Sequence, residues 1–97
     1  MTYELAFLPA ALTEWKQLDG SVREVLKKKL AERLENPHVP AARLHGQKDR
    51  YKIKLRDAGY RLVYEVRDNV MVLLVVAVGK REWDAVYKAA AKRSGRG

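Results

Sequence analysis

Cysteine is absent from this 97-residue chain, which excludes disulfide bonds and thiolate chemistry. The longest apolar run, residues 70–78, has about half the length that a membrane-spanning helix needs. The first residues lack a basic segment followed by an apolar run, so we expect no signal peptide. These absences predict a soluble cytoplasmic protein. Its length allows one domain over residues 1–93, followed by a flexible basic tail at 94–97.

Positive charge is abundant, and its excess lies in the C-terminal part of the sequence. The formal net charge is +8, but residues 1–42 hold six cations and six anions and are therefore neutral. Residues 43–97 hold fourteen cations and six anions. A one-sided excess indicates a polyanionic partner such as RNA, DNA, an acidic protein or an anionic membrane surface. The alternative is a surface that is charged only for solubility.

The first 36 residues predict one strand and two helices. Residues 3–8 are apolar enough for a short strand, and Pro9 suits the first turn of a helix. Ser21 and Glu24 form a capping-box pattern, which predicts the start of a second helix that ends before Pro37. Four residues at helical spacing form its apolar stripe: Val22, Leu26, Leu30 and Leu34.

From about residue 50 the apolar residues no longer recur at helical spacing but at every second position, which predicts three strands. Apolar residues alternate with cations over 51–56, and apolar and mostly charged residues alternate again over 60–67. The continuous apolar run 70–78 indicates a central strand that is covered on both faces and ends at Gly79. Asp84 is a candidate cap for a short last helix that reaches about Lys92. The order β-α-α-β-β-β-α predicts an α+β fold. Its sheet should be mainly antiparallel, with the two N-terminal helices on one face and a short C-terminal helix.

The apolar pattern also predicts how the second and third strands pair. If Leu55 faces Tyr60, the alternating apolar residues share the helix-covered face, and Lys54 lies opposite Arg61 on the other face beside Lys52. A slip by one residue would bury Arg61 among apolar side chains, which is costly. Like charges on neighbouring strands destabilise a sheet, so the cluster indicates a site for an anion, although a merely solvated face would look similar.

Several segments together resemble the RelE branch of the RelE/ParE toxin superfamily. They are Tyr51 to Arg56, Gly59 to Tyr64, Val78 to Glu82, and Val86-Tyr87, with Trp15 and the stretch Val22 to Leu30 in support. The resemblance covers about residues 2–93. It implies a ribosome-dependent mRNA endonuclease of a type II toxin–antitoxin system, which cuts the A-site codon and is neutralised by an antitoxin that wraps it.

The resemblance implies two sets of site residues. The catalytic set is Lys52, Lys54, Arg61, Arg81 and Tyr87. Contacts with RNA are expected from Arg43, His45, Lys48, Arg50, Arg56 and Lys80. His45 stands where related toxins carry arginine, and Trp83 and Asp84 replace more polar or basic residues. The implied partners are mRNA, the small-subunit rRNA of the ribosome and an acidic antitoxin of RelB type. DNA would be reached only through the antitoxin.

The implied reaction is attack of a ribose 2′-hydroxyl on the adjacent phosphate, with a 5′-hydroxyl as leaving group. It needs a base, an acid, and cations around the transition state. No histidine matches the catalytic set, so Lys54 or Tyr87 is the candidate base, because nearby cations lower the pKa of either group. Arg61 and Arg81 would hold the phosphate, and Lys52 would stabilise the transition state. We expect no metal or other cofactor, because no His, Asp or Glu cluster has metal-site spacing.

Two other functions remain open at this point. The ParE branch of the same superfamily inhibits DNA gyrase without cleaving RNA, although its members generally lack this set of lysine, arginine and tyrosine residues. A toxin with degenerate activity could also use its basic face only to bind its antitoxin. The individual residues have ordinary interpretations as well, since Tyr87 could be a packing residue, and Arg81 and Lys80 could be surface charges.

Overall fold

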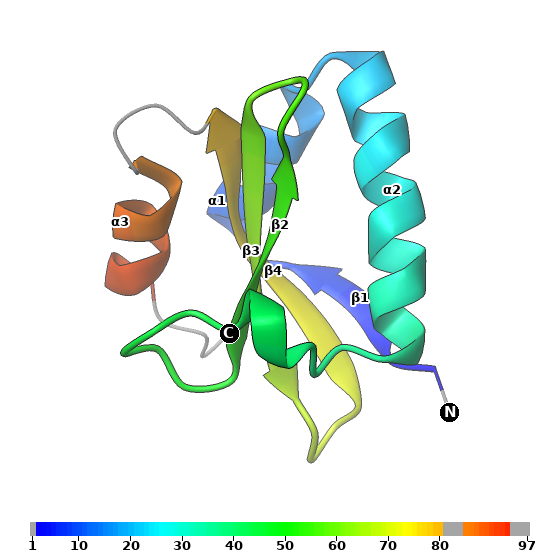
Figure 1. Ribbon diagram of the computed structural model, residues 1–97, viewed down its shortest axis with the longest axis vertical. Coiled ribbons are helices and arrows are strands. Elements are labelled where there is room, and N and C mark those ends of the chain that lie inside the picture. Colours follow the sequence, from blue (N-terminus) through cyan, green and yellow to red (C-terminus); the bar gives the residue numbers. More distant parts are fainter. Residues whose placement is uncertain (1, 81–84, 94–97) are drawn as a thin grey trace.

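The computed structural model describes residues 2–80 and 85–93, with only the backbone of 85–88 included. The order of its elements matches the predicted β-α-α-β-β-β-α arrangement, with one added turn of 3-10 helix (Figure 1). They are β1 (Glu4–Phe7), α1 (Pro9–Lys16), α2 (Gly20–Glu35), η1 (Pro40–Ala42), β2 (Arg50–Leu55), β3 (Tyr60–Arg67), β4 (Val72–Lys80) and α3 (Ala85–Lys92). No helix among the described residues is long and apolar enough to cross a membrane. The predicted tail at 94–97 lies outside the described residues.

The four strands form one sheet in the order β1-β4-β3-β2. β1 runs parallel to β4, whereas the other two pairs are antiparallel, so the prediction of a mainly antiparallel sheet is confirmed. β4 is central, as predicted, and Val75 and Val76 within it are fully buried. Its predicted bounds were wrong at both ends. Val70 is 57% exposed in the preceding turn, and the strand continues past Gly79 to Lys80 because these two residues still pair with β3.

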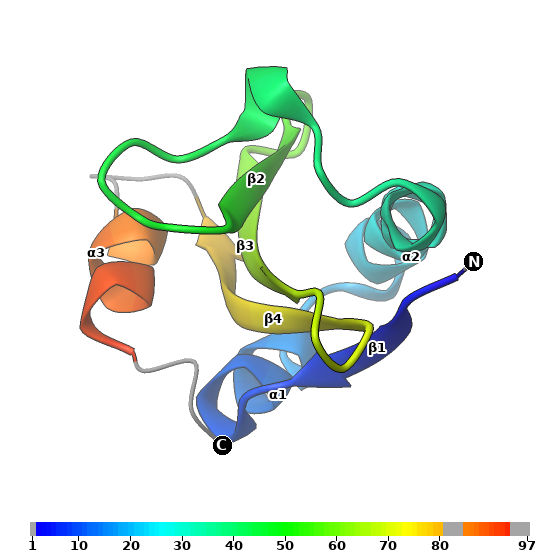
Figure 2. The same cartoon turned by 90° about the horizontal axis from the view of Figure 1, so that it is seen from below.

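Helices α2 and α3 lie on opposite sides of the sheet, which is seen nearly edge-on in Figure 1 and from below in Figure 2. α1 packs mainly against β4. The buried apolar residues of α2 (Val22, Leu26 and Leu30) join those of α1 and the sheet in one core. The apolar stripe predicted for α2 is therefore largely the face that packs on the sheet, and Leu34 is partly buried at its end.

The predicted capping box of α2 is not formed. The helix begins at Gly20 with Asp19 as its cap residue, and no side chain makes a capping hydrogen bond. Ser21 lies inside the first turn, where its hydroxyl donates to the Asp19 carboxylate at 2.8 Å. The helix starts two residues earlier than the pattern suggested, so Glu24 lies two positions beyond the one from which its side chain could close the box.

The register predicted for β2 and β3 is confirmed. Leu55 pairs with Tyr60, Ile53 with Leu62 and Tyr51 with Tyr64. Gly59 allows this pairing, because its φ of 69° lies in the left-handed region and its N–H closes the turn on the carbonyl of Leu55 at 2.8 Å. The turn thereby sets which side chains of the two strands share a face.

Candidate active site

Three cations meet on the face of the sheet that is turned away from α2. Lys54 and Arg61 are direct partners across β2 and β3, and Lys52 precedes Lys54 by one strand period. Lys54 is exposed, whereas Lys52 and Arg61 are partly buried. Lys54 and Arg61 also line a common groove of about 240 Å³ with Arg56 and Tyr60. The geometry therefore brings together the three members of the predicted catalytic set whose side chains the structure describes.

The proximity of these charges changes the ionisation of Lys54. Its pKa is lowered below the usual lysine value, first by repulsion from the ammonium of Lys52, then by partial loss of hydration and by repulsion from Arg61. A positive neighbour disfavours a second positive charge, so the neutral amine is more accessible than for an isolated lysine. A neutral amine can accept a proton, which is the property a general base requires.

The strand that carries the two lysines is held from behind, on the α2 side of the sheet. Arg33, in the last turn of α2, donates from Nη1 to the hydroxyl of Tyr64 at 2.8 Å and to the carbonyl of Lys52 at 3.4 Å. Tyr64 is fully buried and its hydroxyl donates to the carbonyl of Pro37 at 2.7 Å. Tyr51 stacks on Tyr64 with ring centroids 5.6 Å apart. These contacts fix the backbone of β2 beneath the lysines.

The remaining members of the catalytic set belong to the last part of the chain. Arg81 lies outside the described residues, and Tyr87 lies on α3, of which only the backbone is described at that position. α3 is tied to the sheet by Arg50, whose guanidinium donates to the carbonyls of Ala90 and Arg93. Arg93 in turn bonds the carbonyl of Val76 at 2.8 Å. The helix that carries Tyr87 is therefore anchored on the same side of the sheet as the cation cluster.

Arg50 corrects one expectation from the sequence. It was predicted to contact RNA, but it is only 7% exposed and forms an ion pair with Glu65 at 3.1 Å. With α3 and Gln47 as its other partners, its guanidinium is occupied inside the protein. This burial argues against a direct RNA contact and gives the residue a structural role.

The other residues predicted to contact RNA are at the surface. Arg43, His45 and Lys48 are exposed in the segment before β2 and line a groove of about 670 Å³ together with Lys52. Lys80, at the end of β4, is exposed and pairs with Tyr60, next to the pair of Arg61 with Gly79. A cationic surface thus extends from both sides of the cluster.

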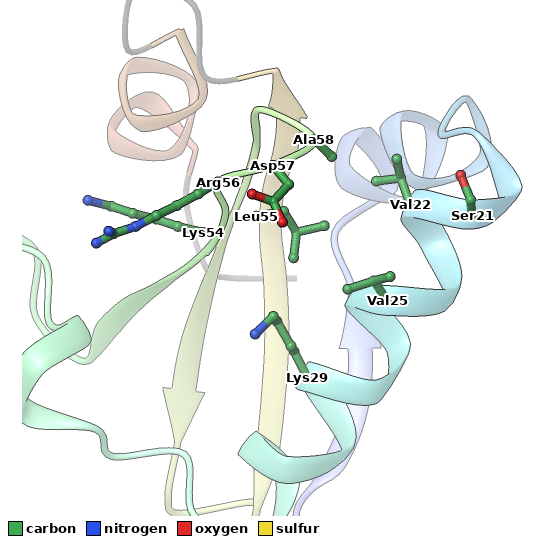
Figure 3. Close-up of a pocket in the computed structure, with 9 residues that line it drawn as sticks. All are labelled: Ser21, Val22, Val25, Lys29, Lys54, Leu55, Arg56, Asp57 and Ala58. Atoms are coloured by element: carbon green, nitrogen blue, oxygen red, sulfur yellow. The ribbon is translucent and has the colours of Figure 1, made fainter.

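A second, more apolar cleft lies on the other side of the β2–β3 turn. It has a volume of about 520 Å³ and is lined by Val22 and Val25 of α2 and by Leu55 and Ala58 of the hairpin (Figure 3). The side chains of Lys54 and Arg56, although counted among its lining, point away from α2 in this view. This cleft is therefore separate from the place where the cations converge.

Arg33 is the residue near the site that the sequence patterns missed. It follows Leu30 by three positions, and residues three apart on a helix share a side, so its place beside the apolar stripe was a usable signal. Among the described residues, no group of three His, Asp or Glu side chains is arranged to hold a metal ion.

Comparison with known proteins identifies the family. A family profile described as the ParE toxin of type II toxin–antitoxin systems, parDE, matches residues 5–85. The chain is 55% identical over 93 residues to the mRNA interferase toxin RelE of Escherichia coli. This alignment covers 96% of the present chain and 98% of the E. coli protein.

Solved structures agree with this relationship. An E. coli RelE variant with two arginines replaced by alanine, in its free state, superposes with a TM-score of 0.89 at 54% identity, covering 96% of this chain and 98% of that one. The intact E. coli RelBE toxin–antitoxin complex contains a chain that matches with a TM-score of 0.80 at 55% identity, covering 82% and 98%. The high identity to RelE over nearly the full length decides between the two branches of the superfamily. The chain therefore belongs to the RelE family of toxins, within the RelE/ParE superfamily of type II toxin–antitoxin systems.

Proposed function

We propose that this protein is an mRNA interferase, which cleaves mRNA on the ribosome and so inhibits translation in the cytoplasm. The observation that carries the proposal is the convergence of Lys52, Lys54 and Arg61 on one sheet face, in a chain so similar to the mRNA interferase toxin RelE. A cluster of cations with one amine of lowered pKa fits a reaction in which a phosphodiester develops negative charge.

In the proposed reaction, the neutral amine of Lys54 removes the proton from a ribose 2′-hydroxyl. The resulting oxyanion attacks the adjacent phosphorus atom and the bond to the 5′-oxygen breaks. The leaving oxygen takes a proton from water, so that a 2′,3′-cyclic phosphate and a 5′-hydroxyl end are formed. Arg61 and Lys52 stabilise the charge on the phosphate oxygens, since arginine stays protonated and cannot act as base. All of these groups are amino-acid side chains, so no step in this scheme needs a metal ion.

Arg81 and Tyr87 complete the set through the family resemblance. Arg81 would neutralise the leaving oxygen, and Tyr87 is the alternative base or a platform on which a nucleobase stacks. Arg43, His45, Lys48, Arg56 and Lys80 would hold the RNA of the ribosome and the message, and their contacts should weaken as salt increases. The antitoxin partner would be a protein of RelB type, as in the solved RelBE complex, and the basic surface of this chain favours an acidic one.

The experiment maps mRNA ends in a translation reaction with loaded ribosomes. Wild-type protein should produce cuts within the A-site codon, and Lys54→Ala should reduce the cleavage rate by roughly a hundredfold or more, the usual contribution of a general base. Lys28→Ala is the matched control, because this exposed lysine of α2 does not belong to the cluster. Intact mRNA with wild-type protein would refute the proposal, and equal activity of Lys54→Ala would remove that amine from the base role.

The family profile that matches residues 5–85 carries the ParE description, so inhibition of DNA gyrase is the control activity to measure beside mRNA cleavage. A ParE-type protein would inhibit DNA gyrase and leave mRNA intact. A supercoiling assay beside the cleavage assay separates the two functions, because only one of the two readouts should respond.

A further inference from the structure

Another groove, distinct from those described above, runs along the outer edge of β2, between η1 and the end of α2. It has a volume of about 360 Å³ and four cations line it: Arg33, Lys52, Lys54 and Arg56. Aliphatic residues from the segment 39–42 form the rest of its lining, and none of the described lining residues is acidic. A groove with cations beside aliphatic surface fits a phosphate joined to a sugar, as in a nucleic-acid backbone.

Arg33 is prepared to bind an anion in this groove. Its contacts with Tyr64 and Lys52 use Nη1 alone, and the guanidinium lies over the Tyr64 ring at 5.7 Å. An arginine has five N–H donors, so Nε and Nη2 remain without a hydrogen bond to the residues that the structure describes. Burial raises the pKa of Tyr64, which keeps the phenol protonated as the fixed support of the guanidinium. A side chain held in place before its ligand arrives loses little entropy on binding.

The groove continues the candidate active site. Lys54 and Arg56 line both this groove and the one that contains Arg61, so the two grooves share a wall. β2 is the outer strand of the sheet, and Figure 2 shows η1 beyond it, on the side away from β3. An RNA strand with one phosphate between Lys54 and Arg61 can therefore pass over the edge of β2 and reach Arg33 with another.

We infer that Arg33 is the centre of a second phosphodiester-binding subsite, which holds an RNA backbone phosphate at the edge of β2. The inference rests on the proposed function in one respect, that the cationic face binds RNA. The chemistry is that of any RNA backbone, so the phosphate can come from the message beside the cut or from ribosomal RNA.

The test measures how much affinity a second phosphodiester adds. The probes are a dinucleotide and a trinucleotide of RNA with every 2′-hydroxyl methylated, which cannot be cleaved, titrated into the protein by NMR. In Arg33→Gln, the extra affinity of the trinucleotide over the dinucleotide should fall about tenfold, equivalent to about 1.4 kcal/mol. The salt dependence of trinucleotide binding should lose about one unit of log–log slope, as expected for one lost phosphate contact.

Two variants separate this role from general charge and from folding. Lys28→Gln removes one charge from the same helix at an exposed position that is not among the lining residues, and should leave the added affinity unchanged. Arg33→Lys keeps the positive charge but lacks the planar guanidinium with its paired N–H donors, so it should retain part of the added affinity. A parallel arm measures co-sedimentation with mRNA-free ribosomes. A loss in that arm alone, with trinucleotide binding unchanged, would assign the phosphate to ribosomal RNA.

The inference is overturned if Arg33→Gln changes neither the added affinity nor ribosome binding, or if it weakens both oligonucleotides equally. It is also overturned if Lys28→Gln has the same effect. Because the oligonucleotide test needs no cleavage, a protein that fails to cut mRNA but still shows the Arg33-dependent gain would refute only the proposed function.

Discussion

Arg50 provides the sharpest prediction about how the fold supports the site. It is 7% exposed, and its guanidinium pairs with Glu65 at 3.1 Å, with Gln47 at 3.0 Å, and with the carbonyls of Ala90 and Arg93. Arg50→Met keeps most of the side-chain volume and removes every one of these bonds. One of them reaches α3 and another reaches the residue just after it, so the substitution tests whether this arginine holds the helix against the sheet.

The expected magnitude follows from these contacts. A hydrogen bond from a charged group contributes about 1.5–3 kcal/mol, and breaking a buried ion pair costs about 3–5 kcal/mol. Glu65 keeps a second partner, Arg67 at 3.0 Å, so its carboxylate is not left alone. We therefore expect Arg50→Met to lower the free energy of unfolding by about 3 kcal/mol, the lower end of the range for a broken buried pair.

Arg67→Met is the matched control, because Arg67 binds the carboxylate of Glu65 from β3 itself, whereas Arg50 also binds the segment of α3. Its side chain is 30% exposed, so its loss should cost no more than about 1 kcal/mol. Urea unfolding gives both values, and hydrogen exchange at the amides of α3 should accelerate only in Arg50→Met. Equal destabilisation by the two substitutions, with α3 protection unchanged, would refute the anchoring role.

Three further predictions concern charge and backbone. Lys52→Met should raise the pKa of Lys54 toward its usual value, since repulsion from Lys52 is the largest cause of its lowering. The rising limb of the cleavage rate should then move to higher pH. A titration of the Lys54 amine by NMR that shows no change in its pKa would contradict this. Gly59→Val should cost about 1–2 kcal/mol in urea unfolding through backbone strain alone, because φ is 69° there and an added Cβ meets nothing within 4 Å. The pKa of Asp68 is lowered chiefly by its hydrogen bond from Tyr3, so its ionised form adds stability above about pH 4 that is lost as the pH falls. The difference in Tm between wild type and Asp68→Asn should therefore shrink below pH 4, and a pH-independent difference would show that the carboxylate contributes nothing.

Periodicity in the sequence was sufficient for the elements and for the register of β2 and β3. Alternation of apolar and charged residues makes only one pairing acceptable, since a slip would bury Arg61, and this pairing places Lys54 and Arg61 on one face. The ends of elements were less predictable. The start of α2 and the end of β4 both differ from the predicted bounds, because the ends of helices and strands leave little trace in a sequence pattern.

The one-sided charge and the motifs shared with RelE toxins were properties of the sequence alone, and they were enough to indicate an RNA-cleaving toxin. Only the tertiary structure decided which cations are available to a ligand. Arg50 and Arg33 look alike as charged residues in the sequence, yet the fold encloses Arg50 between the sheet and α3 and leaves Arg33 beside an open groove. Burial and partner geometry depend on contacts between distant segments. Here the carbonyls of Ala90 in α3 and of Arg93 just after it lie 40 and 43 residues along the chain from Arg50, and no local pattern contains that information.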